Sequence, residues 1–214
     1  MSSVVKYRIG YDSENIPFTF FSNGVGCGAE LDYLRAVCEV ADLDCQFFPM
    51  KWSKLFHSLD VGEVHAIFSS ISRTSQRSLL YNFTMPYFDS PEAIVYKGRL
   101  ESFSAVRSIG VLAGTNHLTY AMSELNTLQL FEFSDLNALA EGIQDESVDS
   151  LLVGVDTAGL FISKFLALDL KLHDELIIAP KYFGEGSSVV VQKNELVLLD
   201  SLNFGISKLG GLSF

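Results

Sequence analysis

The sequence predicts an α/β protein built on parallel, twisted sheets with helices on both faces. Two observations lead to this fold class. Short apolar runs alternate along the chain with segments whose apolar residues recur at helical spacing. Such alternation is typical of parallel sheets, because the crossover between parallel strands usually carries a helix. The 214 residues are enough for one large domain or for two of roughly 100 residues each.

The first half of the chain is predicted to contain three strands, at residues 6–10, 46–49 and 66–69. Two helices separate them. The longer helix covers residues 30–41, where Leu31, Leu34 and Val37 fall on one face. The shorter helix covers residues 52–60 and ends at Gly62, because glycine commonly follows the last turn of a helix.

The second half is predicted to contain six strands, at residues 93–96, 109–112, 128–133, 150–153, 177–179 and 188–192. One helix is expected to start near His117. Another follows Ser134, which is interpreted as its N-cap. Leu136 and Leu139 give this second helix an apolar face.

Arg77 lies where a cation is unusual. It follows a turn rich in hydroxyl groups, and Thr74 is predicted to cap a helix whose first turn contains Arg77. This end of a helix is partly positive, so an arginine here indicates that an anion binds nearby. A guanidinium holds a carboxylate through two parallel hydrogen bonds, and Ser69, Ser70 and Ser72 would add hydroxyl groups. The alternative is an exposed arginine beside an ordinary N-cap.

Other turns follow the ends of predicted strands. Residues 11–17 and 69–77 both do so, and parallel sheets bind ligands beyond the carboxyl ends of their strands. These two segments are therefore predicted to line one crevice. Gly114 and Thr115 follow another strand and form either a second anion-binding turn or simply a turn.

The charge of the chain excludes several classes of partner. The net charge is −11, from 26 acidic and 15 basic residues. Nucleic acids and anionic membranes require a basic surface, so neither is expected as a partner, whereas a cationic small molecule would be attracted. No apolar run approaches the roughly 20 residues of a membrane helix. No metal or cofactor is expected, because no motif for either stands out.

The chain start and the cysteines bear on the compartment. No secretory leader opens the sequence, and Met1-Ser2-Ser3 is typical of an expression start, so we expect that a leader was removed. Cys38 and Cys45 can form a disulfide if their Cα atoms come within about 7 Å. A bridge would imply an oxidising compartment, and the alternative is two buried free cysteines. Cys27, between two glycines, is predicted to be a small residue in a turn.

Short segments spread over nearly the whole chain match one family pattern. They are Ile9-Gly10-Tyr11-Asp12, Pro17-Phe18, Gly28, Asp32, Gly62, the turn from Ser69 to Arg77, Phe83, Pro86-Tyr87, Val111-Leu112-Ala113-Gly114-Thr115 and Lys181-Tyr182-Phe183-Gly184-Glu185-Gly186. With these segments the chain resembles the periplasmic solute-binding proteins for polar amino acids, especially the lysine/arginine/ornithine and histidine binders. The last segment resembles the return strand of the basic amino acid subgroup.

The resemblance implies a two-lobed α/β fold of the type II periplasmic binding proteins, with a ligand cleft between lobes joined by two hinge strands. Lobe I is expected at residues 1–89 plus 187–214, and lobe II at residues 90–186. Closure of the hinge around the ligand is a switching mode of such an architecture. Cys38 and Cys45 stand where the subgroup carries its disulfide, so the resemblance implies a bridge here. It also implies a monomer.

The resemblance assigns the groups that bind the carboxylate of an amino acid ligand. Arg77 would hold the α-carboxylate, with help from Ser72 and from donors at Thr115 and Asn116. These residues come from both expected lobes.

Other residues would bind the rest of the ligand. Ser69 and Ser70 would contact the α-ammonium and the stem. Trp52 stands where the family stacks an aromatic ring on the ligand side chain, and an indole suits a guanidinium or an ammonium. Asp12 matches the carboxylate that pairs with a basic side chain. The alternatives are a core position for Trp52 and a loop cap for Asp12.

Two departures from the family bear on the ligand. The family usually closes the strand over residues 150–153 with an aspartate that binds the α-ammonium, and Gly154 stands there. Asp156 is the predicted substitute. Without one, a buried ammonium would be poorly paired, and a ligand without an α-amino group becomes the alternative. Asn15 replaces an aromatic residue that covers the ligand, and it is predicted to hydrogen-bond a polar ligand tip.

The predicted function is binding of a polar, basic amino acid, such as arginine, lysine, ornithine or histidine, and its delivery to the permease of an inner-membrane ABC transporter. The predicted location is the periplasm, and no enzyme activity is expected. One alternative is a dehydratase of the prephenate or arogenate type, with Arg77 as the carboxylate clamp and Glu185 or His117 as the acid. The other is a ligand-sensing module of a larger receptor.

Overall fold

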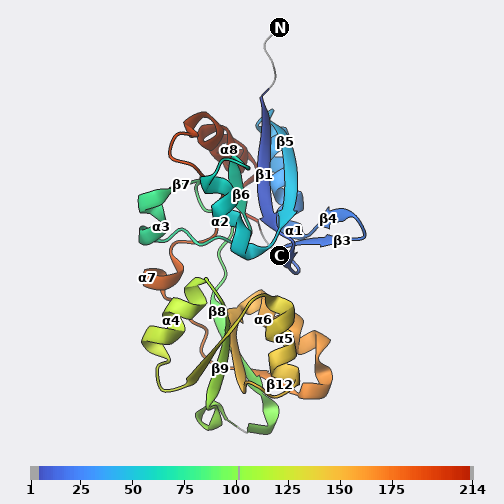
Figure 1. Ribbon diagram of the computed structural model, residues 1–214, viewed down its shortest axis with the longest axis vertical. Coiled ribbons are helices and arrows are strands. Elements are labelled where there is room, and N and C mark those ends of the chain that lie inside the picture. Colours follow the sequence, from blue (N-terminus) through green and yellow to red (C-terminus); the bar gives the residue numbers. More distant parts are fainter. Residues whose placement is uncertain (1–4, 101, 213–214) are drawn as a thin grey trace. The chain divides into compact units, whose positions relative to one another are not determined.

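The computed structural model describes residues 5–100 and 102–212, so Met1-Ser2-Ser3 lie outside the described residues. The chain divides into two compact units (Figure 1). The first comprises Met1–Asp89 and Gly184–Phe214, and the second comprises Ser90–Phe183. The chain thus re-enters the first unit at Gly184, three residues before the expected return at residue 187.

The first unit contains a sheet of five described strands in the order β5-β1-β6-β13-β7. In sequence order they are β1 (Lys6–Asp12), β5 (Asp44–Met50), β6 (Ala66–Phe68), β7 (Asn82–Phe83) and β13 (Val190–Val191). β1 pairs in parallel with β5 and β6, whereas β13 runs antiparallel to β6 and β7. The carboxyl ends of β1, β5 and β6 therefore lie at the same edge of the sheet.

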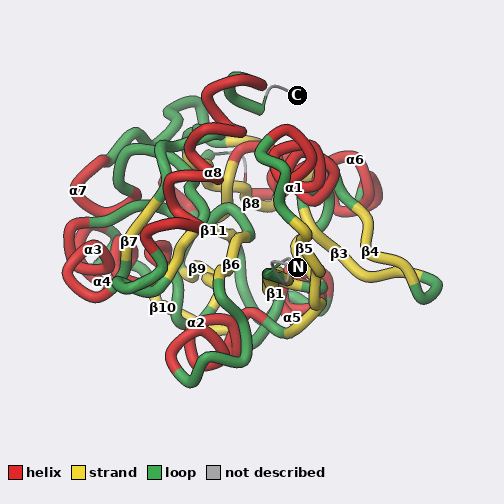
Figure 2. Tube along the Cα trace, turned by 90° about the horizontal axis from the view of Figure 1, so that it is seen from above, coloured by secondary structure: helices red, strands yellow, loops and turns green. Residues whose placement is uncertain are grey.

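Helices cover both faces of this sheet. α1 (Ala29–Val40) and α8 (Leu196–Leu209) pack side by side on one face, where they bury Phe68 (Figure 2). α2 (Trp52–Asp60) covers the other face, where it buries Ile67. Neighbouring residues of β6 thus enter different cores, as the pleat of a strand requires.

A small sheet precedes α1. It contains β2 (Glu14–Asn15), β3 (Thr19–Ser22) and β4 (Val25–Cys27), and the β3–β4 hairpin extends away from the five-stranded sheet (Figures 1 and 2). Gly28 follows with a φ of 118°, and a Cβ there would clash with the carbonyl oxygen of Phe18. Only glycine fits this close approach of two backbones.

The second unit contains a sheet of five described strands in the order β10-β9-β11-β8-β12. In sequence order they are β8 (Glu92–Lys97), β9 (Ser108–Leu112), β10 (Gln129–Phe133), β11 (Ser150–Gly154) and β12 (Leu170–Leu172). β9 pairs in parallel with β10 and β11, and β8 runs antiparallel to β11 and β12. The first residue of β8 therefore lies at the edge where β11 ends.

Helices cover both faces of the second sheet as well. α5 (Leu136–Gln144) and α6 (Val155–Lys164) pack on one face against Val153, and α4 (Asn116–Glu124) packs on the other against Leu152. The predicted α/β fold class with helices on both faces is confirmed. Short 3-10 helices lie at Gly98–Leu100, Phe103–Ala105 and Leu166–Leu168.

Two local predictions in the first part of the chain differ from the structure. β1 continues to Asp12, two residues into the segment that was expected to be a loop, because β5 pairs with it as far as Met50. The strand expected at 188–192 is shorter, with ladder pairing only at Val190–Val191.

Three predictions in the second part are corrected. The N-cap of α5 is Asp135, not Ser134, because the carboxylate of Asp135 accepts the hydrogen bond of the Ala138 N–H at 2.9 Å. The strand expected at 177–179 is a single bridge between Ile177 and Glu92, because β8 begins at Glu92 and offers no strand residue beyond it. The expected return strand begins instead as α7 (Pro180–Phe183), a helical turn with proline at its first position.

The disulfide expected from the family resemblance is confirmed. Cys38 of α1 and Cys45 of β5 are bonded, and their Cα atoms lie 6.4 Å apart. Cys27 is free, and its thiol donates to the carbonyl oxygen of Val25 at 3.6 Å. The bridge ties the end of a helix to the strand that follows it.

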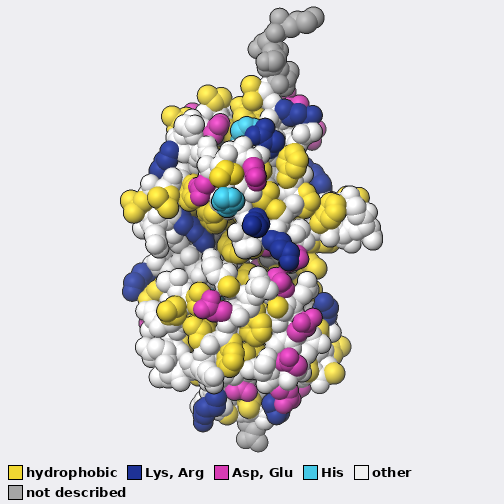
Figure 3. Space-filling view, in the orientation of Figure 1, with side chains coloured by type: hydrophobic (Ala, Val, Ile, Leu, Met, Phe, Trp, Pro, Cys, Tyr) yellow, Lys and Arg dark blue, Asp and Glu magenta, His cyan; other side chains and the backbone are white. Residues whose placement is uncertain are grey.

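The surface of the described part of the chain carries both signs of charge. On the face drawn in Figure 3, acidic and basic side chains are interspersed with hydrophobic ones. Within residues 5–100 and 102–212, no helix is long and apolar enough to cross a membrane. In the same residues, no group of three or more His, Cys, Asp or Glu side chains is placed to hold a metal ion.

Candidate functional site

The turn after β6 forms the centre of the candidate site in the first unit. Ser69 and Ser70 have positive φ values of 156° and 48°, which residues other than glycine rarely adopt. The Ser69 hydroxyl accepts a hydrogen bond from the Asp12 N–H at 2.8 Å and lies 2.7 Å from the Thr19 hydroxyl. The Ser69 side chain is thus held by the backbone of β1 and by the side chain of Thr19.

Glu30 of α1 is hydrogen-bonded to the same turn, and the sequence did not predict this role for it. Its side chain is completely buried, and Oε1 accepts the Ser70 N–H at 2.7 Å while Oε2 accepts the Ser70 hydroxyl at 3.2 Å. The Tyr87 hydroxyl also donates to Oε1 in a short hydrogen bond. Burial raises the pKa of Glu30, although the bonds from Tyr87 and Ser70 act in the opposite direction. The only sequence signal is an acidic residue in the first turn of a helix, which is common on exposed helices too.

Arg77 lies in α3 (Ser75–Leu80), and the predicted N-cap is confirmed, because the Thr74 hydroxyl accepts the Arg77 N–H at 3.3 Å. The guanidinium donates from Nη1 to the carbonyl oxygen of Ser72 at 3.2 Å and lies 5.2 Å from the centre of the Phe56 ring. Burial lowers the pKa of Arg77 to about 10. Among the described residues, no carboxylate forms an ion pair with this guanidinium.

Three further predicted residues of the first unit lie at the same edge of the sheet. Asp12 ends β1, is buried, and accepts the Glu14 N–H at 3.1 Å through Oδ1. The Asn15 amide donates to the Ser70 hydroxyl at 3.4 Å. Trp52 begins α2 just after β5 and contacts the Phe56 ring edge-on, with 6.4 Å between ring centres.

These contacts decide which predicted residues of the first unit come together. Asp12 is hydrogen-bonded to Ser69, and Asn15 is hydrogen-bonded to the next residue, Ser70. Arg77 and Ser72 form a second group, which shares Phe56 with Trp52. Both groups follow the carboxyl ends of parallel strands, which is the edge where such sheets bind ligands.

In the second unit, Thr115 and Asn116 begin α4. Thr115 is the N-cap residue, but its hydroxyl donates to the carbonyl oxygen of Leu112 at 2.6 Å instead of capping the helix. The first N–H groups of α4 therefore have no side-chain cap, and such groups suit an anion. Gly114 turns the chain into the helix with a φ of 70°.

The second predicted element of this unit is Asp156. It lies in the first turn of α6, half-buried, and its Oδ2 accepts the Ser90 hydroxyl at 2.7 Å. Asp156 thus contacts the residue at which the chain enters the second unit. Gly154, the last residue of β11, precedes this turn and is the N-cap of α6.

A carboxylate–imidazole pair lies beside Gly154, and sequence reasoning missed its acidic member. Glu92 pairs with Gly154 in the antiparallel ladder of β8 and β11. Its Oε2 lies 2.6 Å from Nε2 of His117 in α4, and the two side chains are 13% and 21% exposed. The His117 ring also packs against Phe183, with 5.4 Å between ring centres. No signal in the sequence marks Glu92, because the strand register that places it depends on residues about 60 positions away.

Comparison with known proteins identifies a family pattern over almost the whole chain. The pattern of the "Bacterial extracellular solute-binding proteins, family 3" matches residues 7–210. A match over so much of the chain includes both units.

The individual relatives have low sequence identity to this chain. The arginine-binding periplasmic protein of Mannheimia haemolytica is 26% identical over 176 residues, which are 82% of this chain and 73% of the relative. The ABC transporter arginine-binding protein 1 of Escherichia coli is 24% identical over 208 residues, 94% of this chain and 84% of the relative. A solved Salmonella typhimurium periplasmic binding protein of high arginine specificity superposes with a TM-score of 0.87 at 20% identity, covering 95% and 92% of the two chains. This structural likeness shows a shared two-lobed α/β fold.

Proposed function

This chain belongs to the bacterial extracellular solute-binding proteins of family 3, and we propose that it binds a basic amino acid, with arginine as the first candidate. Its relatives in Mannheimia haemolytica and Escherichia coli are named for binding arginine. The net charge of −11 favours a cationic ligand over an anionic one.

The observation that carries this proposal is the state of Arg77. Its guanidinium is withdrawn from water, which lowers its pKa to about 10, and within the described residues it has no carboxylate partner. A charge removed from water without a counter-ion is unfavourable. The α-carboxylate of a ligand would supply the counter-ion through two parallel hydrogen bonds. We propose that Ser72, Thr115 and Asn116 add donors to this carboxylate.

The basic side chain of the ligand requires an acidic and an aromatic partner. Asp12 supplies a buried carboxylate at the end of β1, and Trp52 supplies a flat ring that attracts a guanidinium or ammonium. Ser69 and Ser70 lie beside Asp12, and Asn15 bonds to Ser70. We propose that Asp12, Trp52 and Asn15 contact the ligand side chain, and that Ser69 and Ser70 contact the α-ammonium and the stem.

The proposal extends to location and partners. A periplasmic location is supported by the names of the relatives and by the Cys38–Cys45 bridge, since disulfides persist in oxidising compartments. The protein would act there as a monomer that delivers its ligand to the permease of an ABC transporter.

The experiment that tests the ligand is calorimetric titration with arginine, lysine, ornithine, histidine and glutamine. Arginine should bind, and at about 100 times Kd it should add roughly 2.7 kcal/mol to the apparent free energy of unfolding. Arg77→Lys keeps the charge but loses the planar fork, so arginine should bind at least about tenfold more weakly. Arg73→Lys, an exposed arginine on the same turn, should leave the affinity unchanged.

Two outcomes would contradict the proposal. Either none of the five amino acids binds, or Arg77→Lys binds arginine as tightly as the parent protein does.

We also propose that the chain is not an enzyme, in keeping with relatives that are named as binding proteins. The dehydratase alternative needs an acid beside the carboxylate clamp, and Glu185 and His117 are the candidates from the sequence. Incubation with prephenate and arogenate, followed by chromatographic analysis, distinguishes the two. Unchanged substrates support a binder, whereas conversion that stops on Arg77→Lys would favour the dehydratase.

A further inference from the structure

We propose that Glu92 is the carboxylate of the second unit that binds the α-ammonium of the ligand. This assignment rests on the proposed function, because it presupposes an amino acid ligand. It adds to that function a residue that comes from a strand neighbouring the one where the family carries an aspartate.

Glu92 lies at the edge of the sheet where a ligand would bind. β9 and β11 run in parallel, so their carboxyl ends, Leu112 and Gly154, share one edge. β8 runs antiparallel to β11 with Glu92 opposite Gly154, so the first residue of β8 lies at that same edge. The open N-terminus of α4, proposed to face the ligand carboxylate, begins at this edge as well.

There is room for a side chain at Gly154, and a carboxylate oxygen borders that space. A Cβ built on Gly154 would have one described heavy atom within 4 Å, the Oε2 of Glu92 at 3.6 Å. The backbone of Gly154, with φ −60° and ψ 148°, is ordinary extended backbone that any residue adopts. The absent side chain therefore leaves room for a small cationic group against Glu92.

His117 orients this carboxylate. Its Nε2 lies 2.6 Å from Oε2, and this hydrogen bond fixes the side chain and leaves Oε1 as an acceptor. His117 is thus a positioning residue, and Glu92 is the residue that contacts the ligand.

Asp156 is the competing carboxylate. One of its oxygens accepts the Ser90 hydroxyl at 2.7 Å, and its backbone lies inside α6. Its contact with Ser90, the first residue of the second unit, gives it a role in holding the start of β8 beside α6. The side chain of Glu92 is hydrogen-bonded to the ring of His117, not to Ser90.

The test compares two ligands that differ in the α-ammonium. Calorimetric titration uses arginine and 5-guanidinopentanoate, which is arginine without its α-amino group. Glu92→Gln keeps the shape and removes the charge, so arginine should bind about 30-fold or more weakly. The affinity for 5-guanidinopentanoate should change by less than about twofold, because that ligand has no ammonium to lose.

Matched variants separate this role from general effects on folding. Asp156→Asn, and Glu141→Gln on the exposed face of α5, should keep the parent's affinity for arginine. Gly154→Asp added to Glu92→Gln returns a carboxylate to the same space and should restore most of the lost affinity. Restoration of binding also shows that Glu92→Gln folds.

The outcomes distinguish this assignment from the proposed function. If the unsubstituted protein binds no amino acid, both are wrong. If it binds arginine and Glu92→Gln binds it equally well, or loses affinity equally for both ligands, the assignment alone is wrong. A selective loss on Asp156→Asn would place the ammonium at Asp156 and overturn the assignment to Glu92.

Discussion

Arg77 and Glu30 are charges that the first unit withdraws from water in different ways. Arg77 has a carbonyl oxygen and an aromatic ring as neighbours, but within the described residues no anion. Glu30 is fully satisfied by hydrogen bonds from Ser70 and Tyr87. One residue therefore needs a ligand for its charge, whereas the other holds the turn on which that ligand is proposed to bind.

Replacement of Glu30 by Gln should change how stability depends on pH. The pKa of Glu30 is raised above 4.5 in the folded state, so the native state binds more protons than the unfolded chain over the window that starts near 4.5. The stability that Glu30 contributes is therefore present below this window and is lost as pH rises through it. Gln mimics the protonated form, since its amide can donate to the Ser70 hydroxyl.

The measurement is urea unfolding of the parent and of Glu30→Gln between pH 4 and pH 8. The variant should gain stability relative to the parent as pH rises. A constant difference across this range would show that Glu30 does not titrate as expected. Glu39→Gln, at an exposed position later in α1, serves as the control and should show no trend.

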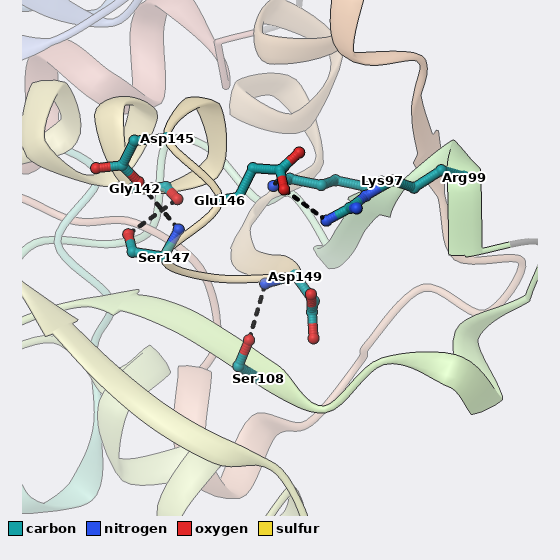
Figure 4. Close-up of polar contacts among 8 residues, drawn as sticks. All are labelled: Lys97, Arg99, Ser108, Gly142, Asp145, Glu146, Ser147 and Asp149. Atoms are coloured by element: carbon teal, nitrogen blue, oxygen red, sulfur yellow. Dashed lines mark hydrogen bonds and ion pairs between the residues drawn. The ribbon is translucent and has the colours of Figure 1, made fainter.

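Lys97 is a buried charge of the second unit with incomplete partners. Its side chain is 3% exposed, its Nζ has no hydrogen-bond acceptor, and Glu146 lies 3.8 Å away (Figure 4). Arg99 takes the shorter ion pair with Glu146, at 3.1 Å. Burial lowers the pKa of Lys97 from 10.5.

Lys97→Met should therefore raise the free energy of unfolding at pH 7, by about 1 kcal/mol. With a lowered pKa, the unfolded chain binds more protons just below pH 10.5, so the parent regains stability as pH rises through that window. The advantage of the variant should shrink as pH rises towards 10.5. Denaturant unfolding at several pH values checks this, and a destabilised variant at pH 7 would contradict it.

Two adjacent residues of the second unit are candidates for the N-cap of α5. Ser134 and Asp135 are adjacent, and both are good N-cap residues by type. In the structure, Asp135 has an extended backbone and accepts the Ala138 N–H, while Ser134 donates to Asp135 at 2.9 Å. The choice depends on where β10 ends, which the residue types alone do not fix.

This difference gives a paired test. Asp135→Ala removes the cap of α5 and should lower the free energy of unfolding by about 1 kcal/mol. Ser134→Ala should lower it by less than about 0.5 kcal/mol, because it removes a contact outside the helix. Thermal unfolding of both variants decides it, and equal losses would assign the cap to both residues.

The disulfide acts on the first unit at the same scale. It closes a short loop between α1 and β5, across a sequence separation of 7 residues. A loop of this length stabilises the fold by about 2.5 kcal/mol through the unfolded state. Replacing both Cys38 and Cys45 by Ala should cause a loss of that order, measured by denaturant unfolding. Cys27→Ala, at the free cysteine, is the control and should cause little change.

The net charge of the whole molecule creates an electric field that acts on a charged ligand at long range. The described surface carries both signs of charge, but the total is −11. A cationic ligand is attracted by this field, and salt screens it with a Debye length of about 10 Å at 0.1 M.

The affinity for arginine should therefore fall several-fold between 0.05 and 0.5 M NaCl. Citrulline, which has nearly the same shape with a neutral side chain, is the matched control and should lose less. Calorimetric titration of both ligands over this range provides the measurement. Equal salt dependence would mean that the ligand side chain is not recognised by its charge.

Much of the fold follows from local patterns in the sequence. The helix at residues 52–60, the cap at Thr74 and the alternation of strands and helices agree with the structure. The disulfide was implied only by the family resemblance, and the structure confirms it. The helix, the cap and the alternation depend on neighbours within a few residues or on a repeated pattern, so the sequence carries their signal directly.

Which distant residues meet depends on the packing of the whole chain. The buried position of Glu30 depends on Ser70 and Tyr87, and the position of Glu92 beside Gly154 depends on the pairing of β8 with β11. The strand expected at 177–179 likewise became a single bridge at the first residue of β8. Apolar periodicity was enough to predict amphipathic helices such as α1 and α2, because that signal lies in residues a few positions apart. It did not determine the register between strands, because register depends on how all elements pack together.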